Sequence, residues 1–263
     1  MQFSLAGWWQ LSPLTDLAIP QDDIHFPAPL SSVLPAELSE AQVAAQEWHL
    51  MHDFMLDDGH INHAAIDLVI AGIDYFAEVR INGVAVFDCD GSQAVYRKDI
   101  KPYLKSGGNR IEILFLEQED EWLVETAVCD LGEPEAVPHD SRIGIWATPY
   151  LEMIPQVRLQ YVATEQVWHH GGGCEFLVEL FYHCLKPGLV AAQVKFNGMT
   201  LNVPLDVRDD HASVLFQVEA PRTYRLEQPD PADLYLLQVS LDGQQREFHI
   251  GLNSSQCVVH FPL

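Results

Sequence analysis

The sequence predicts an all-β protein made of two successive β-sandwiches. Three features support this prediction. Short apolar runs alternate with polar residues along most of the chain, which is typical of strands with one buried face. The pairs Asn82-Gly83, Asn197-Gly198 and Asp242-Gly243 follow such runs and supply the positive φ angles of tight hairpins. Only residues 38–47 have helical character, with Ser39 as a candidate N-cap.

Composition limits the class of protein. The 263 residues suffice for one large domain or two modest ones, and 48% hydrophobic content is that of a globular protein. A formal charge of −24 argues against a nucleic-acid partner, because a phosphate backbone would be repelled. No apolar run reaches the roughly 20 residues of a membrane span. The N-terminus lacks a signal-peptide pattern, and the 5 scattered cysteines indicate free thiols. We therefore expect a cytoplasmic protein with no membrane partner.

The stretch 65–87 predicts a buried antiparallel meander that ends in the Asn82-Gly83 hairpin. Its apolar residues alternate on either side of a break at residues 72–74: Ile66, Leu68, Ile70, then Val79, Ile81, Val84 and Val86. This stretch resembles the core motif of the sugar-binding domain that opens glycoside hydrolases of family 2, the β-galactosidase, β-glucuronidase and β-mannosidase group.

Other segments of the first half are similar to the same domain. Trp48 and Phe54 match its framing aromatics, and residues 143–152 resemble the strand that completes it. Residues 105–109 are expected to form a hairpin turn before an inward row of Ile111, Ile113 and Phe115. Trp8 and Trp9 are both expected to plug the sandwich edge. The resemblance implies a jelly-roll, galactose-binding-like sandwich over residues 1–154.

Residues 155–263 predict a second, immunoglobulin-like β-sandwich. Its short strands carry alternating apolar residues and end at hairpin signals, as in the runs from Phe176 to Tyr182 and from Tyr235 to Leu241. Residues 248–253 resemble the family strand that leads into the catalytic barrel. Asn253 stands where the family has an arginine.

The two sandwiches leave no room for the family's catalytic apparatus. Glycoside hydrolysis needs two carboxylates, about 5 Å apart in retaining enzymes. The resemblance places both on a (β/α)₈ barrel, which takes about 250 residues. We therefore assign no catalytic residue and no cofactor, and expect a non-catalytic carbohydrate-binding or scaffolding protein. The alternatives are a glycosidase subunit that needs a separate barrel chain, or a protein–protein interaction module; a homo-oligomer is also compatible with the sequence.

The acidic segment 117–142 offers the candidate carbohydrate site. The aromatic ring of Trp122 suits the apolar face of a sugar, and neighbouring charged groups suit its hydroxyls. The candidate residues are Asp120, Glu121, Trp122, His139, Asp140 and Arg142. The alternative is a structural loop in which Trp122 is buried.

Three runs suggest metal sites, but none fits one. His49 and His52 are three apart on a predicted strand, so their side chains point to opposite faces. Residues 88–91 lack the glutamate of a calcium loop and are expected to form a solvated loop. Residues 168–174 hold adjacent histidines and Cys174 without three convergent zinc ligands. We expect a loop between strands there, and no metal.

Overall fold

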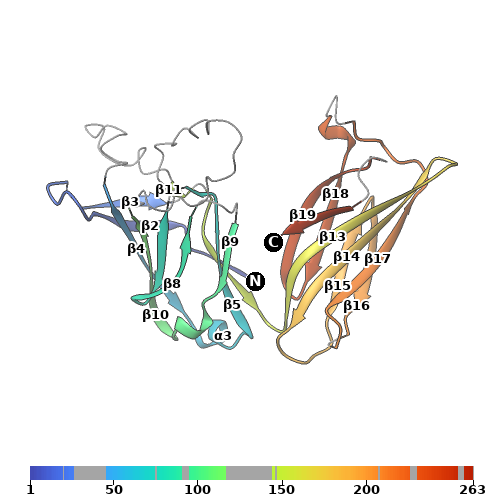
Figure 1. Cartoon of the computed structure of the whole chain (residues 1–263). Helices are drawn as coiled ribbons and strands as arrows, with labels where there is room; N and C mark the ends of the chain where they lie inside the picture. The colour runs from blue at the N-terminus through green and yellow to red at the C-terminus, as the bar shows by residue number, and fades with distance from the viewer. Residues whose placement is uncertain are drawn as a thin grey trace, which may run out of the picture. The chain divides into compact units, whose positions relative to one another are not determined.

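The structure is a computed structural model, and it describes residues 1–19, 21–26, 46–74, 76–90, 95–116, 144–145, 147–206, 208–225, 230–253 and 258–262. Regular structure in these ranges is almost entirely β-strand, which confirms the predicted all-β class (Figure 1). Within the same ranges, helix is confined to one α turn and two 3₁₀ turns, α3 (Asp58–Ile61), η1 (Lys101–Tyr103) and η3 (Pro231–Asp233). None of these could cross a membrane.

The chain forms two compact units. The first consists of Gln2–Asn62 and Ile66–Met153. The second consists of Met1, His63–Ala65 and Ile154–Leu263.

The first unit is a sandwich of two main sheets. A four-stranded sheet has the order β1-β12-β5-β9, with β1 at Gln2–Ser4, β12 at Tyr150–Ile154, β5 at Ala65–Ala71 and β9 at Val95–Asp99. A six-stranded antiparallel sheet has the order β3-β2-β4-β10-β7-β8, with β3 at Asp22–Phe26, β2 at Gly7–Pro13, β4 at Trp48–Leu56, β10 at Gly107–Phe115, β7 at Ala77–Ile81 and β8 at Val84–Cys89. A short pair joins β6 (Ile73–Asp74) to β11 (Gly144–Ile145).

The predicted meander over residues 65–87 is wrong in its first strand. The hairpin of β7 and β8 forms as expected, with Asn82 at φ 51° and Gly83 at φ 83°. However, β5 pairs with β9 in the four-stranded sheet and not with β7. The chain crosses from one sheet to the other after β5. The sequence does not reveal this, because alternation of apolar residues indicates which face is buried but not which strand is the partner.

The predicted hairpin turn at residues 105–109 is also wrong. Gly107, Gly108 and Asn109 are the first residues of β10, and the strand before them, β9, belongs to the opposite sheet. The segment therefore joins two sheets, with η1 in between. Its Gly107 has φ 93°, which explains the glycine without a hairpin.

The one described α turn follows β4. Asp57 caps α3 by accepting a hydrogen bond from the His60 N–H at 2.8 Å. The helix predicted at residues 38–47 lies outside the described residues, except for Gln46 and Glu47, which are not helical.

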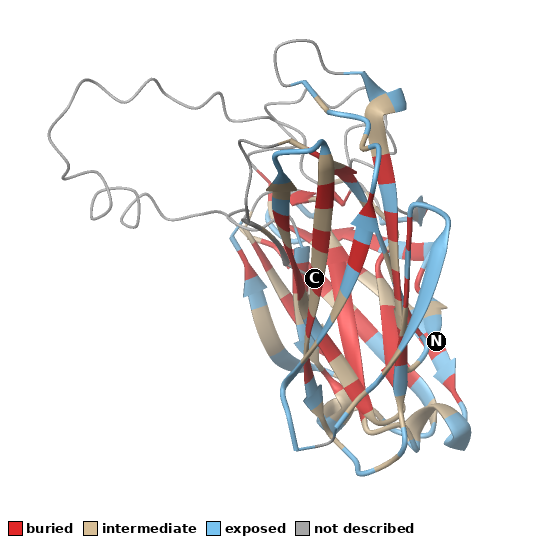
Figure 2. Ribbon diagram, turned by 90° about the vertical axis from the view of Figure 1, so that its right-hand side faces the viewer, coloured by how far each residue is buried: buried red, intermediate tan, exposed pale blue. Residues whose placement is uncertain are grey.

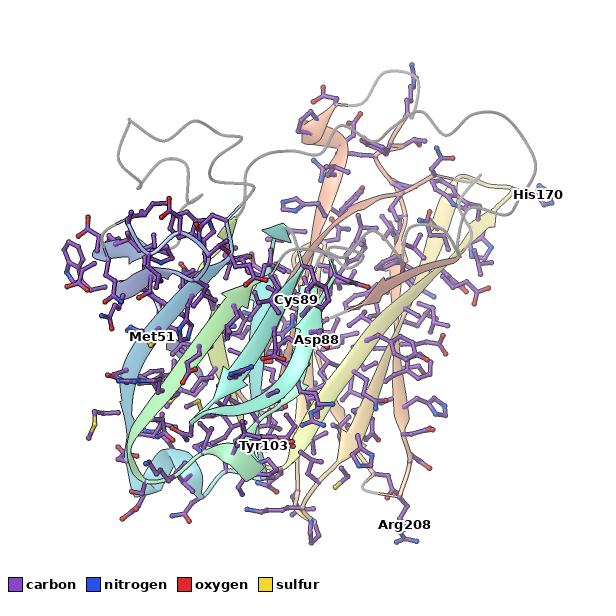
Figure 3. All side chains as sticks on the ribbon, turned by 60° about the vertical axis from the view of Figure 1, so that its left-hand side comes forward. Met51, Asp88, Cys89, Tyr103, His170 and Arg208 are labelled. Carbon is purple, nitrogen blue, oxygen red and sulfur yellow. The ribbon has the colours of Figure 1, made fainter. Side chains whose placement is uncertain are left out.

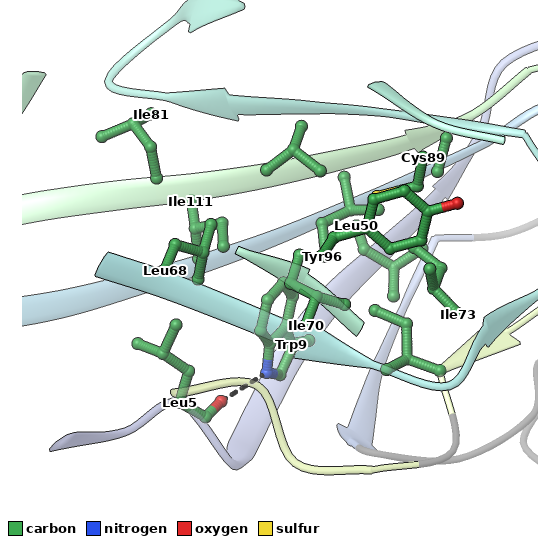
Figure 4. Packing of buried hydrophobic residues seen from close by; sticks show 14 of the residues in the cluster. Leu5, Trp9, Leu50, Leu68, Ile70, Ile73, Ile81, Cys89, Tyr96 and Ile111 are labelled. Carbon is green, nitrogen blue, oxygen red and sulfur yellow. Dashed lines mark hydrogen bonds between the residues drawn. The ribbon is translucent and has the colours of Figure 1, made fainter. Parts of the chain in front are cut away.

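One continuous core fills the first sandwich, and Trp9 lies in it. Trp9 is fully buried and donates its indole N–H to the carbonyl oxygen of Leu5 at 3.0 Å (Figure 4). Trp8 is 68% exposed, so the expectation that both tryptophans are buried is wrong for Trp8. Successive residues of a strand point to opposite faces, and only one of two neighbours on β2 can therefore enter the core.

The second unit is an immunoglobulin-like sandwich, as predicted. One sheet has the order β17-β14-β13-β20, with β17 at His211–Val218, β14 at Gly173–Cys184, β13 at Val157–His169 and β20 at Val258–Pro262. The other has the order β16-β15-β18-β19, with β16 at Met199–Pro204, β15 at Ala191–Phe196, β18 at Leu234–Leu241 and β19 at Gln244–Gly251.

Strands of this unit show the predicted alternation of buried and exposed residues (Figure 2). The hairpins at Asn197-Gly198 and Asp242-Gly243 also form as predicted. Their first residues have φ 48° and 49°, and their glycines φ 75° and 81°, which are angles of a type I′ turn.

Candidate functional site

The outer face of the six-stranded sheet carries a hollow of about 440 Å³. Residues of β2, β3, β4 and β10 that point away from the core line it, together with His52 at its edge: Trp8, Gln10, Asp23, Met51, His52, Asp53 and Arg110. Figure 3 labels Met51 on β4. The volume lies within the range of roughly 300–1,000 Å³ that is usual for small-molecule sites.

Trp8 is the largest exposed aromatic group of this hollow. Its ring meets that of His25 edge to face, at 5.7 Å between centroids and 86° between planes. Its backbone is held as well, because His52 donates an Nδ1–H to the Trp8 carbonyl oxygen at 2.9 Å. The His52 ring is fixed in turn by stacking on Trp9 at 5.0 Å. The backbone of Trp8 is thus connected to the buried ring of Trp9 through His52.

Asp53 and Arg110 form the polar wall. They oppose each other on β4 and β10, and Arg110 donates from Nε and Nη2 to the two carboxylate oxygens at 2.7 and 2.9 Å. The hydrogen bond from Arg110 lowers the pKa of the Asp53 carboxyl below its ordinary value, and the pKa of Arg110 is raised in return.

This pair contributes little to folding. The side chains of Arg110 and Asp53 are 48% and 70% exposed, and exposed ion pairs add only about 0–1 kcal/mol to stability. The contact is nevertheless bidentate, a geometry that makes arginine–carboxylate pairing specific. Arg110 Nη1 has no hydrogen-bond partner within the described part of the chain.

His49 and His52 diverge on β4, as expected. The His49 Nε2 lies 3.3 Å from a carboxylate oxygen of Glu112, whereas His52 stacks beside Trp9. Among the described residues no three histidine, cysteine or acidic side chains gather as a metal site would require.

Two buried carboxylates lie elsewhere in the first unit, and both bind one arginine. Arg97 donates from Nε to Asp67 and from Nη2 to Glu152, each at 2.7 Å. Asp67 is 1% exposed and Glu152 is fully buried. Because both carboxylates bind the same guanidinium and neither is open to solvent, we assign this cluster a structural role.

Two runs considered for metals have ordinary structures. His169 ends β13 and Gly173 begins β14, so a tight turn joins the strands, and Cys174 is buried. The solvated loop predicted at residues 88–91 is wrong for Cys89, which ends β8 and is fully buried. Cys89 belongs to the hydrophobic core of the first unit.

All six residues proposed from the sequence as a carbohydrate site lie outside the described residues: Asp120, Glu121, Trp122, His139, Asp140 and Arg142. The hollow on the sheet is not predicted from the sequence. Its one local signal is the Trp8-Trp9 pair, since one of two adjacent tryptophans on a strand has to face outward. Asp53 and Arg110 are 57 residues apart and carry no local signal.

The hollow combines groups that suit a polyhydroxylated ligand. An exposed indole offers a flat apolar surface, and the carboxylates of Asp23 and Asp53 accept hydrogen bonds. The Arg110 guanidinium and the Gln10 amide donate them. These groups can hold a ligand by stacking and by hydrogen bonds.

Comparison with known proteins confirms the resemblance to accessory domains of family 2 glycosidases. Residues 32–137, which are less than half of the chain, match the family model described as glycosyl hydrolase 2 galactose-binding domain-like. A search among curated protein sequences finds no significant match.

Solved structures match nearly the whole chain in fold. The β-D-mannosidase from Dictyoglomus thermophilum has a TM-score of 0.75 at 16% identity, over 95% of this chain and 36% of its own. The β-D-glucuronidase from the same organism has a TM-score of 0.63 at 16% identity, over 96% and 44%. A putative β-galactosidase from Bacteroides fragilis has a TM-score of 0.64 at 14% identity, over 96% and 41%. This chain thus spans less than half the length of each of these structures.

Proposed function

We propose that this protein is a non-catalytic carbohydrate-binding protein related to the accessory domains of family 2 glycosidases, and that the sugar binds in the Trp8 hollow. Residues 1–154 and 155–263 are the proposed domains. A cytoplasmic location agrees with the free thiols of Cys89, Cys174 and Cys184.

The observation that carries this proposal is the exposure of Trp8 beside the Asp53–Arg110 pair. A ligand that covers a tryptophan that is 68% exposed removes apolar surface from water, which favours binding, and here the backbone of the tryptophan is held in place. The pair next to it adds little stability. A sugar that stacks on the indole and forms hydrogen bonds with Asp53 and Arg110 would use both features.

The test is a titration of the purified protein with mannose, galactose, glucose and glucuronic acid. Binding is measured by calorimetry and by the melting temperature, which rises when a ligand binds the folded state. Trp8→Ala is expected to weaken binding by about tenfold or more, as for an anchor in a binding site. Trp8→Tyr keeps a ring and should retain most of the affinity. Trp8→Leu is the matched control that keeps apolar bulk without a flat face.

Three results would count against the proposal. Absence of binding for every sugar, or equal affinity of the Leu and Tyr variants, would reject the proposal. Hydrolysis of nitrophenyl glycosides by this chain alone would reject its non-catalytic part.

A second candidate function is that of a glycosidase subunit completed by a separate barrel chain. The observation that favours it is that the chain matches only 36–44% of the length of three glycosidases. It predicts glycosidase activity only after such a chain is added. Light scattering of the protein alone tests the further alternative of a homo-oligomer.

The acidic segment remains a separate proposal for sugar contact. Its residues are Asp120, Glu121, Trp122, His139, Asp140 and Arg142. Trp122→Ala abolishes binding if that segment is the platform and leaves it unchanged if Trp8 is. The two tryptophan variants, measured side by side, decide between the sites.

A further inference from the structure

We infer that the sugar site is a groove with at least two subsites, so that its ligand is an oligosaccharide and not a single sugar. This inference rests on the proposed function. It starts from a second hollow, of about 420 Å³, on the other side of the Asp53–Arg110 pair. Both hollows have Asp53 and Arg110 in their walls, so the pair forms their common boundary.

The groove crosses the strands of the six-stranded sheet. The first hollow lies over β2, β3 and β4, and the second over β4 and β10 as far as Asn82, at the turn after β7, and Lys105. Neighbouring strands are about 4.8 Å apart, so a ligand that reaches from Trp8 to Lys105 has to cover three strands or more. That span exceeds one pyranose ring and suits two or three joined ones.

Gly108 lines the second hollow without a side chain. Gly108 opposes Met55 on β4, and a Cβ atom at Gly108 would lie 3.7 Å from the Met55 sulfur, which is an ordinary contact. Its backbone has no left-handed φ, so other residues are compatible with the fold at this exposed position. The glycine leaves an opening that the fold itself does not require.

A buried amide network makes the floor of the second hollow rigid. Asn109 is 3% exposed, accepts hydrogen bonds from the Lys105 N–H and the Asn82 amide, and donates to the carbonyls of Lys105 and Gly107, at distances of 2.7 to 3.1 Å. Asn82 also donates to the carbonyl of Tyr103, which Figure 3 labels. A site held in this way loses little entropy when a ligand binds.

The polar groups of the second hollow that can still form hydrogen bonds suit a sugar unit rich in hydroxyls. The Lys105 ammonium has no ion-pair partner in the described ranges of the chain, and the same is true of the outer nitrogen of Arg110. Asp53 supplies carboxylate oxygens from the shared wall. A second sugar unit would find donors and an acceptor here, beside the largely buried ring of Phe54.

The experiment compares affinities for mannose, mannobiose and mannotriose, and for glucose, cellobiose and cellotriose, in the wild type and in a graded series of Gly108→Ala and Gly108→Val. For the sugar series that binds, we expect the disaccharide or the trisaccharide to bind at least about tenfold more tightly than the monosaccharide. Gly108→Val should remove this gain, Gly108→Ala should reduce it, and neither should change the affinity for the monosaccharide. Ser213→Val, also at an exposed strand position but in the second unit, is the matched control.

The results separate this inference from the proposed function. If a monosaccharide binds at Trp8 as tightly as its oligomers, or if Gly108→Val leaves the gain intact, the groove is wrong and the Trp8 site stands. If no sugar of any length binds, the proposed function fails, and the groove with it. Melting temperatures close to that of the wild type establish that the variants are folded.

Discussion

His52 fixes Trp8 from the side of the core. It donates a hydrogen bond to the Trp8 carbonyl oxygen at 2.9 Å, and its ring stacks on Trp9, the buried neighbour of Trp8, at 5.0 Å with 16° between the planes. A carbonyl only accepts, so the proton is on Nδ1 in this contact. The backbone position of Trp8 is thereby tied to the buried ring of Trp9.

His52 is therefore expected to act as a positioning residue for the sugar. His52→Phe keeps an aromatic ring against Trp9 but loses the donor, so sugar affinity should fall several-fold, while stability changes by only about 0.5–1.5 kcal/mol. Calorimetry with the best sugar and urea unfolding measure the two effects. The matched control is His49→Phe on the same strand, which does not line the hollow and should leave affinity unchanged. Equal losses in both variants would contradict a positioning role.

The two adjacent tryptophans should differ sharply in their effect on stability. Trp9→Ala removes a fully buried ring and its hydrogen bond to Leu5, and should cost about 3–5 kcal/mol of unfolding free energy. Trp8→Ala removes an exposed ring and should change that free energy by about 0.5 kcal/mol or less. Urea denaturation of both variants checks this. Similar losses would mean that Trp8 is covered in solution.

Sugar binding should be insensitive to pH until Asp53 is protonated. Its folded pKa lies below the ordinary 3.8, chiefly because of the hydrogen bond from Arg110. The carboxylate and its interactions are therefore fully present above the unfolded pKa and are lost as pH falls through the lower, folded value. Affinity should be constant from about pH 8 to 5 and decline only below about pH 4. Circular dichroism at each pH shows that the fold persists. A decline between pH 7 and 5 would implicate a histidine instead.

Cys89 should be inert in the folded protein. Burial, reinforced by the charges of Asp88 and Asp90, raises the pKa of its thiol to about 12, and the thiolate is the reactive form. At pH 8, iodoacetamide should leave the peptide with Cys89 unlabelled while it labels the half-exposed Cys184. Addition of urea should make both react. Native labelling of Cys89 at the rate of Cys184 would show that β8 opens readily.

Much of the strand pattern can be predicted from the sequence, because it follows from neighbouring residues. All three hairpins form at Asn82, Asn197 and Asp242, since the left-handed φ of a tight turn is a property of those residues and the glycines after them. The inward row of Ile111, Ile113 and Phe115 is fully buried, as alternation predicts.

The tertiary structure decided which strands pair and which groups meet. That β5 joins β9 rather than β7, and that Asp53 meets Arg110 across 57 residues, depends on long-range packing that no local pattern records. The same packing put Trp9 inside and left Trp8 out. The sequence by itself determined where strands and turns form, since backbone angles and alternation are local. Only the folded sheet, which brings distant strands to within about 5 Å of one another, determined that Trp8, Asp53 and Arg110 line the same hollow.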